Sequence, residues 1–186
     1  MGVSGNLTIG PVCYGFAVAY LVLAIPAWLE TQPPAHIVLA SALLGTALIV
    51  LSSIDFYVQR LPDILTLPLA VAGIGLCAAF GWGNLVERSA AAAVAYVSLF
   101  VVAALYQMLR GRPGLGLGDA KLFAAAGAWV GFDGLPSVLL FATGSALCFV
   151  TACLATGRAT TSATRIAFGP FLAFGLWLVW LYGPLK

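Results

Sequence analysis

The sequence predicts an all-α protein, a polytopic integral membrane helix bundle with about seven transmembrane segments. Two observations lead to this prediction. Of the 186 residues, 62% are hydrophobic and only 8% are charged, and the mean hydropathy is +1.08. Soluble domains carry about 25% charged residues, so this chain could not cover a water-exposed surface. Seven helices of about 20 residues fill the sequence, and we expect one membrane-embedded domain over residues 1–186.

Each break between segments falls on residues that end a membrane helix. Glu30 and a proline pair close the first segment, and Pro62, which disfavours helix at the preceding residue, separates the second from the third. Turn residues around Glu87 precede the fourth segment, the run GRPGLGLGD precedes the fifth, and Asp133 with Gly134 forms a predicted turn before the sixth. The segments cover residues 11–28, 37–54, 64–80, 90–109, 120–132, 137–155 and 166–182.

The fifth segment is shorter than the others. From Asp119 to Phe132 an α-helix rises about 21 Å, whereas the hydrocarbon core is about 30 Å thick. We therefore expect Asp119 to lie below the membrane surface. The segment also carries Gly127 and Gly131 four residues apart among alanines. This spacing indicates either a face for close helix packing or an alanine-rich helix without a special contact.

The basic residues predict the orientation, because Lys and Arg near helix ends are retained in the cytoplasm. With seven spans, six of the eight basic residues fall on one side, and only Arg88 and Lys186 fall on the other. The loops that follow Asp55 and precede Asp119 lie on the positive side, so both acids should be near the cytoplasmic face. The N-terminus is then cytoplasmic and the C-terminus outside. The six are Arg60, Arg110, Arg112, Lys121, Arg158 and Arg165.

Several function classes are excluded by composition. The net charge of +2 is spread thinly, and no basic cluster is long enough for nucleic acid. The four cysteines lie in apolar runs without a CxxC pair, so we interpret them as small buried hydrophobes and expect no metal site. The first basic residue is Arg60, which is unlike a signal peptide and indicates that the first segment is retained.

The acids are few, and each is a candidate for function because an ionisable group inside a membrane is costly unless paired or hydrated. Glu30, Glu87 and Asp133 lie among polar or turn residues and are explained as solvated positions. Three acids remain without this explanation, namely Asp55, Asp63 and Asp119.

The local sequence separates these three acids. Asp55 continues the second apolar segment in LIVLSSIDF, and we expect it on helical backbone at the membrane edge. We interpret Asp63, which follows Pro62, as the N-cap of the third helix, where a carboxylate accepts free N–H groups. Taken alone, Asp119 is also explained as an N-cap that follows a flexible glycine-rich loop.

Together, Asp55 and Asp119 predict an aspartic protease pair on separate helices at one membrane face. Two close carboxylates in a low-dielectric site cannot both ionise easily, so one keeps its proton while the other activates a water. The water attacks the peptide carbonyl while the protonated partner polarises its oxygen. No competing set is present, because His36 lies near the opposite face and no GxSxG or HExxH motif occurs.

Three stretches carry a wider pattern. SSIDFYVQRLPDILTLPL covers residues 52–69, GLGLGDAKLFAAAGAWVG covers residues 114–131, and IAFGPFLAFG covers residues 166–175. In this order and with these separations they resemble the type IV prepilin peptidases, which are members of the GxGD membrane aspartyl proteases. One position departs from the family's PFGP segment, because Ala167 replaces its first proline.

The resemblance implies the roles of site residues. Asp55 matches the family's first catalytic aspartate, and Gly116, Gly118 and Asp119 match the GxGD signature. Lys121 follows as the family usually has it. Two residues from Asp119, it lies on roughly the opposite helix face, and we expect it to support the site, as Asp63 does.

The resemblance also implies the activity, which is that of a membrane aspartyl endopeptidase without a cofactor. It would remove the short basic leader of prepilins or pseudopilins at the cytoplasmic face, for a type IV pilus or type II secretion. The implied location is the cytoplasmic (inner) membrane of a prokaryote, in contact with lipid. Full-length family members carry a further N-terminal helix and a cytoplasmic domain, often with paired cysteines, that is associated with N-methylation. We expect a short form with intact peptidase motifs, and the sequence does not determine whether it has methyltransferase activity.

Three alternatives remain open at this point. A presenilin-like or signal-peptide-peptidase-like GxGD enzyme would carry a PAL motif near its C-terminus, where this chain has FGP. A proton- or cation-coupled transporter would use the embedded aspartates, although both acids are predicted at one face and not at the midplane. A purely structural membrane subunit would tolerate the loss of both acids. The sequence does not determine the oligomeric state.

Overall fold

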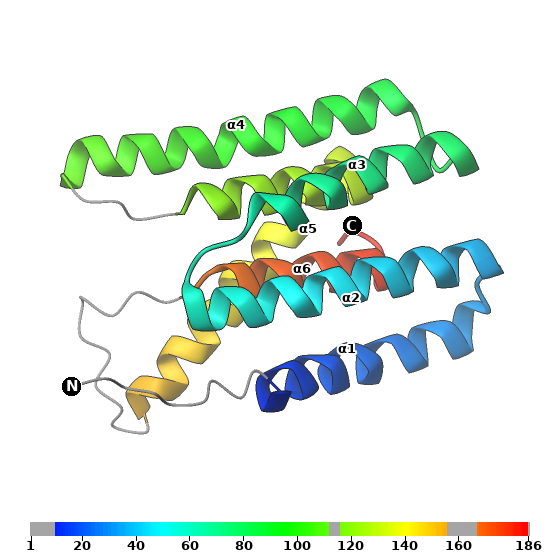
Figure 1. The fold of residues 1–186 in the computed structure, drawn as a ribbon, viewed down its shortest axis with the longest axis horizontal. Coiled ribbons are helices and arrows are strands. Elements are labelled where there is room, and N and C mark those ends of the chain that lie inside the picture. The colour runs from blue at the N-terminus through cyan, green and yellow to red at the C-terminus, as the bar shows by residue number, and fades with distance from the viewer. Residues whose placement is uncertain (1–9, 112–115, 156–166, 186) are drawn as a thin grey trace.

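The computed structural model describes residues 10–111, 116–155 and 167–185, with side chains from residue 13 onward. Within these ranges it contains helices and no strands. Five helices are long and apolar enough to cross a membrane, and the sixth is a shorter apolar helix of 14 residues. The prediction of an all-α membrane bundle is therefore confirmed (Figure 1). The helices are α1 (Gly10–Thr31), α2 (Ala35–Val58), α3 (Asp63–Phe80), α4 (Leu85–Arg110), α5 (Leu117–Ala155) and α6 (Gly169–Tyr182).

Helix α5 holds two of the predicted segments. A straight helix of its 39 residues would be about 58 Å long, almost twice the hydrocarbon core. The backbone leaves helical geometry at Gly131, with φ 72° and ψ −171°, and Figure 1 shows the two parts of α5 running in different directions. Six helices, one of them broken in two, correspond to the seven predicted segments.

The predicted position of this break was wrong by a few residues. Asp133 and Gly134 are helical, and Asp133 is exposed in the first turn after the break. The chain turns at Gly131 because its backbone conformation is one that only glycine adopts without strain. A turn predicted from an Asp-Gly pair therefore fell on the wrong glycine.

Arg88 of α4 holds the break in place. Its guanidinium donates to the carbonyl oxygen of Trp129, near the end of the first part of α5, and to that of Trp82 at 3.2 Å. The last carbonyls of a helix have no partner within the helix, and a cation suits that end of its dipole. Trp129 is fixed in turn, since its indole N–H donates to the carbonyl of Leu69 at 2.8 Å. Arg88 and Trp129 thus join α3, α4 and α5.

The first part of α5 packs very closely against α4. A Cβ atom at Gly127 would lie 2.6 Å from the carbonyl oxygen of Ala91, a distance at which no side chain fits. Small residues allow helix backbones to approach in this way. Of the two alternatives left open by the sequence, close helix packing is the correct one for Gly127, whereas Gly131 lies at the break in α5.

Helix α6 separates the two elements that carry the candidate aspartates. It packs on both α2 and α5, while α2 and α5 do not pack directly on one another over the described ranges. Figure 1 places the start of α6 at the end of the bundle where α2 ends and α5 begins. We call this end the site end.

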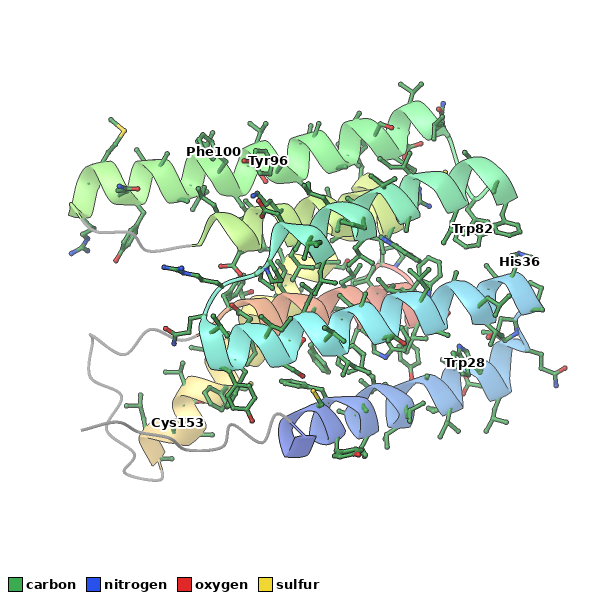
Figure 2. All side chains as sticks on the ribbon, in the orientation of Figure 1. Trp28, His36, Trp82, Tyr96, Phe100 and Cys153 are labelled. Atoms are coloured by element: carbon green, nitrogen blue, oxygen red, sulfur yellow. The ribbon has the colours of Figure 1, made fainter. Side chains whose placement is uncertain are left out.

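The other end of the bundle is filled by aromatic rings, and we call it the aromatic end. The ring of His36 stacks on Phe80 with centroids 4.8 Å apart, and on Trp82 at 6.0 Å. Trp82 contacts Trp180 at 5.6 Å, and Trp180 meets Trp129 edge-on at 5.2 Å. His36 and Trp82 are labelled at this end in Figure 2. As predicted, His36 lies far from the candidate aspartates.

The cysteines are only partly buried. Cys77 is buried, Cys13 and Cys153 are half-buried, and Cys148 is exposed on α5. None of the four forms a disulfide. The prediction that every cysteine is buried was wrong for Cys148, because an apolar side chain can face outward when the surroundings are lipid.

Candidate active site

Burial divides the six acids into two groups. Asp55 is 5% exposed and Asp119 is 8% exposed, and they are the only buried charged residues in the described part of the chain. A buried carboxylate is costly unless it is hydrogen-bonded or paired, so both positions need specific partners. The exposed acids are Glu30, Asp63, Glu87 and Asp133.

Asp55 lies in the last turn of α2 and is held by the start of α6. Its Oδ2 accepts the backbone N–H of Gly169 at 3.0 Å. The first N–H groups of a helix have no partner within the helix and favour a negative charge. A Cβ atom at Gly169 would lie 2.5 Å from Oδ2 of Asp55, so this approach requires glycine.

Gly169 was not among the residues selected from the sequence. The available signal was the order Phe168, Gly169, Pro170, because proline is favoured in the first turn of a helix and marks the helix start that presents the glycine N–H. The stretch was noted only for its family resemblance. No local rule connects it with Asp55, which lies 114 positions earlier.

Asp119 lies in the first turn of α5, where it closes a cap. Its Oδ2 accepts the N–H of Gly116 at 3.3 Å, and its own N–H donates to the carbonyl of Gly116 at 3.1 Å. The helix begins at Leu117, so Asp119 is its third residue. The alternative that made Asp119 the N-cap residue was therefore wrong in position. Its side chain reaches back to the cap residue, as the acid of a capping box does.

Gly118 brings the start of α5 against the loop between α2 and α3. A Cβ atom at Gly118 would lie 2.7 Å from the Cβ of Leu61, and Leu61 is buried. The absence of a side chain at Gly118 therefore lets this loop pack on the turn that carries Asp119. The contact ties the chain just after Asp55 to the chain just before Asp119.

Asp63 and Lys121 form an ion pair beside this contact. The Lys121 Nζ lies 2.5 Å from Oδ1 of Asp63, whose side chain is 58% exposed. The prediction that Asp63 is an N-cap was wrong, because Pro62 occupies the cap position and Asp63 is the first residue of α3. Its carboxylate still lies at the favourable end of the helix dipole. The ion pair links α3 to α5 outside the buried pair.

The two buried carboxyl groups lie at the same end of the bundle, near enough for the charge of Asp55 to repel that of Asp119, although their helices do not pack directly on one another. Like charges in a poorly solvated site disfavour double ionisation, so such a pair can hold one proton between them. That division allows one group to accept a proton from water while the other donates a proton to substrate. The described residues include no group of three or more His, Cys, Asp or Glu able to hold a metal ion.

Comparison with known proteins adds independent information. A family model described as the type IV leader peptidase family matches residues 42–154, a range that includes Asp55 and Asp119. The chain is 42% identical over 148 residues to a prepilin leader peptidase/N-methyltransferase from Burkholderia pseudomallei, with 76% of this chain and 46% of the relative covered.

Two further relatives carry the same name. One from Aeromonas hydrophila is 36% identical over 157 residues, with 82% of this chain and 52% of the relative covered. One from Escherichia coli K12 is 42% identical over 125 residues, with 67% and 55% covered. The chain spans about half the length of these curated relatives, and no solved structure matches it. From the family model and the relatives together, the chain belongs to the type IV leader peptidase family.

Proposed function

We propose that this protein is a membrane aspartyl endopeptidase that removes the short basic leader of prepilins or pseudopilins. The observation that carries the proposal is the burial of Asp55 and Asp119, and of no other described charged residue, at one end of the bundle. The family and the names of the relatives support the same reaction. We propose that residues 1–186 act as one peptidase domain.

In the proposed mechanism, a water between Asp55 and Asp119 is the nucleophile. The ionised carboxyl group takes a proton from this water, and the protonated one polarises the peptide carbonyl and later assists the leaving amine. The N–H groups of Gly169 and Gly116 hold the two carboxyl groups in fixed orientations before substrate arrives. Such preorganisation lowers the reorganisation needed during the reaction.

Four residues support the pair in this proposal. The N–H of Gly116 donates to the carboxyl group of Asp119. Gly118 has no side chain, which leaves room for Leu61 to pack against the turn that carries Asp119. Asp63 and Lys121 fasten α3 to the first turn of α5. None of the four carries a proton for the reaction.

We also propose the orientation and the substrate side. The site end would face the cytoplasm, with the N-terminus inside and the C-terminus outside, because Arg60, Arg110 and Lys121 lie near the helix ends there, whereas Arg88 lies near the start of α4 at the other end (Figure 1). The membrane would be the cytoplasmic (inner) membrane of a prokaryote. A precursor whose apolar helix lies in the bilayer could then present its basic leader at the cytoplasmic face. The product would serve a type IV pilus or a type II secretion system.

The proposal is limited to peptidase activity. The relatives are also named N-methyltransferases, but the chain spans about half of their length. The stretches that resemble the family contain Asp55, Asp119 and Gly169, which are the two carboxyl groups and a hydrogen-bond partner of one of them. These groups do not indicate methyl transfer.

The test is cleavage of co-expressed precursor proteins by Asp55→Asn and Asp119→Asn variants. Asparagine keeps the shape and can still accept the glycine N–H, but it cannot carry the proton. We expect each variant to reach the membrane in normal amount and to lose activity by about 10²–10⁴-fold. Asp133→Asn changes an exposed acid on α5 and is the matched control.

The outcomes separate the alternatives. Full cleavage in either aspartate variant would refute the proposed pair. Proton or cation flux in liposomes that depends on both acids, without cleavage of any precursor, would support a transporter instead. Normal function in the double variant would indicate a structural subunit.

A further inference from the structure

Two hydroxyl groups are buried near Asp55 without a hydrogen-bond partner. Tyr20 of α1 is 2% exposed and Ser52 of α2 is fully buried, and the hydroxyl oxygens of both have no partner. Buried hydroxyl groups are nearly always hydrogen-bonded, because an unpaired one loses its water without replacement. Two such groups in one place therefore need an explanation.

The packing of Tyr20 shows that its position is fixed. Its ring lies against Trp177 of α6, with centroids 5.3 Å apart, and its carbonyl oxygen accepts the indole N–H of Trp177 at 3.1 Å. Its hydroxyl lies beside that of Ser52, without a hydrogen bond between the two. Trp177 thus holds both the ring and the backbone of Tyr20, while the Tyr20 hydroxyl has no hydrogen-bond partner.

Ser52 also differs from the neighbouring serines of α2. Ser41 and Ser53 donate to the carbonyls of Ile37 and Ile49, four residues earlier, at 2.8 and 2.7 Å. A serine inside a helix commonly satisfies its hydroxyl in this way. Ser52 makes no such bond, so its hydroxyl is available to a partner across the helix interface.

Ser52 and Asp55 share one face of α2. Residues three apart on a helix are neighbours, with Cβ atoms about 5–6 Å apart. The Tyr20 hydroxyl, which lies beside Ser52, therefore meets the face of α2 that also carries Asp55. Buried waters occupy sites of this kind, where two to four polar groups converge without satisfying one another.

We propose that the hydroxyls of Tyr20 and Ser52 bind a water molecule behind Asp55, and that this water positions the Asp55 carboxyl group. The inference rests on the proposed function in one respect, since it assigns Asp55 a role in the reaction. Tyr20 and Ser52 are positioning residues in this scheme. They act on Asp55 through the water, in addition to the N–H of Gly169.

The first test compares Tyr20→Phe, Ser52→Ala and the double variant in precursor cleavage. Each single variant removes one hydroxyl and little volume. We expect each to lower kcat about five- to tenfold, the effect of losing one hydrogen bond, with KM unchanged. The double variant should be no worse than either single variant, because each one already loses the shared water. Matched controls are Tyr14→Phe, on the exposed side of α1, and Ser98→Ala on α4.

The second test does not depend on cleavage. A membrane-permeant carbodiimide modifies protonated carboxyl groups, and mass spectrometry of the Asp55 peptide measures the rate. We expect this rate to change several-fold in Tyr20→Phe and Ser52→Ala, and to stay constant in Tyr14→Phe and Ser98→Ala. Thermal unfolding in detergent is measured for every variant.

The results distinguish the two proposals. Unchanged modification of Asp55 in both variants would overturn the water site, whether or not kcat falls. A higher Tm with unchanged kcat would also overturn it, since removal of a truly unpaired hydroxyl stabilises a protein. If the wild-type protein cleaves no precursor but the modification rate of Asp55 still changes in the two variants, the result would support the water site and refute the proposed function.

Discussion

The two ends of the helix bundle are held together by different chemical groups. At the aromatic end, large side chains make the contacts: stacked rings around Trp82 and Trp180, and the guanidinium of Arg88 on the Trp129 carbonyl. At the site end, the backbone N–H groups of two glycines make the contacts, because they donate hydrogen bonds to Asp55 and Asp119. Side chains thus make the principal contacts at one end, and backbone N–H groups hold the carboxyl groups at the other.

The difference follows from what each end has to hold. A buried carboxyl group needs fixed dipoles at short range, and glycine lets the backbone come close enough to supply them. A break inside a membrane helix needs donors for the released carbonyls, and a long cationic side chain supplies these. If this comparison is correct, substitutions at the site end should affect activity, and substitutions at the aromatic end should affect stability.

The largest expected effect on activity outside the aspartates is that of Gly169→Ala. The new Cβ would lie 2.5 Å from Oδ2 of Asp55, so the carboxyl group must move. Displacement of a catalytic group by about 1 Å can lower the rate about 10²-fold. We expect a loss of this size in precursor cleavage with only a small change in Tm. Gly144→Ala, where a Cβ meets nothing within 4 Å, is the control, and an equal loss there would contradict the argument.

Arg88→Met should produce the largest loss of stability. It removes the charged donor from the Trp129 and Trp82 carbonyls but keeps most of the side-chain volume. A hydrogen bond from a charged group contributes about 1.5–3 kcal/mol, and we expect a loss of that order in detergent unfolding. Arg110→Met, at the exposed end of α4, should change stability little. Normal stability of Arg88→Met would show that the break needs no cap.

Gly131→Ala tests the break itself. At φ 72° and ψ −171° a Cβ atom strains the backbone, and we expect a loss of about 1–2 kcal/mol in the free energy of unfolding. Precursor cleavage by the folded fraction should remain within a few-fold of wild type, because the site end does not depend on this turn. A selective loss of cleavage at normal stability would mean that the two ends are coupled.

The smallest effect belongs to the ion pair of Asp63 and Lys121. Its partly exposed position limits its contribution to about 0–1 kcal/mol. Asp63→Asn and Lys121→Met should each lower Tm slightly and cleavage by less than tenfold, and the double variant should be no worse than either. Loss of all cleavage in Asp63→Asn would instead make Asp63 a member of the catalytic pair.

The sequence by itself determined the class of protein and the identity of the candidate acids. The scarcity of charge requires a lipid environment, and the positions of polar, proline and glycine residues separate seven apolar segments, because these properties act locally. The same reasoning set Glu30, Glu87 and Asp133 aside as solvated positions, whereas Asp119 was selected by its pairing with Asp55 and by the family resemblance. The structure buries Asp55 and Asp119 and exposes the other three.

Only the tertiary structure decided how these residues meet. It broke α5 at Gly131, paired Asp63 with Lys121, and placed the N–H of Gly169 on Asp55. Each contact joins residues that are distant in sequence, or selects one of several glycines by a backbone angle that its neighbours do not specify. The burial of Asp55 and Asp119 depends on such contacts, because a carboxyl group becomes stable inside the bundle only where another segment brings a donor to it.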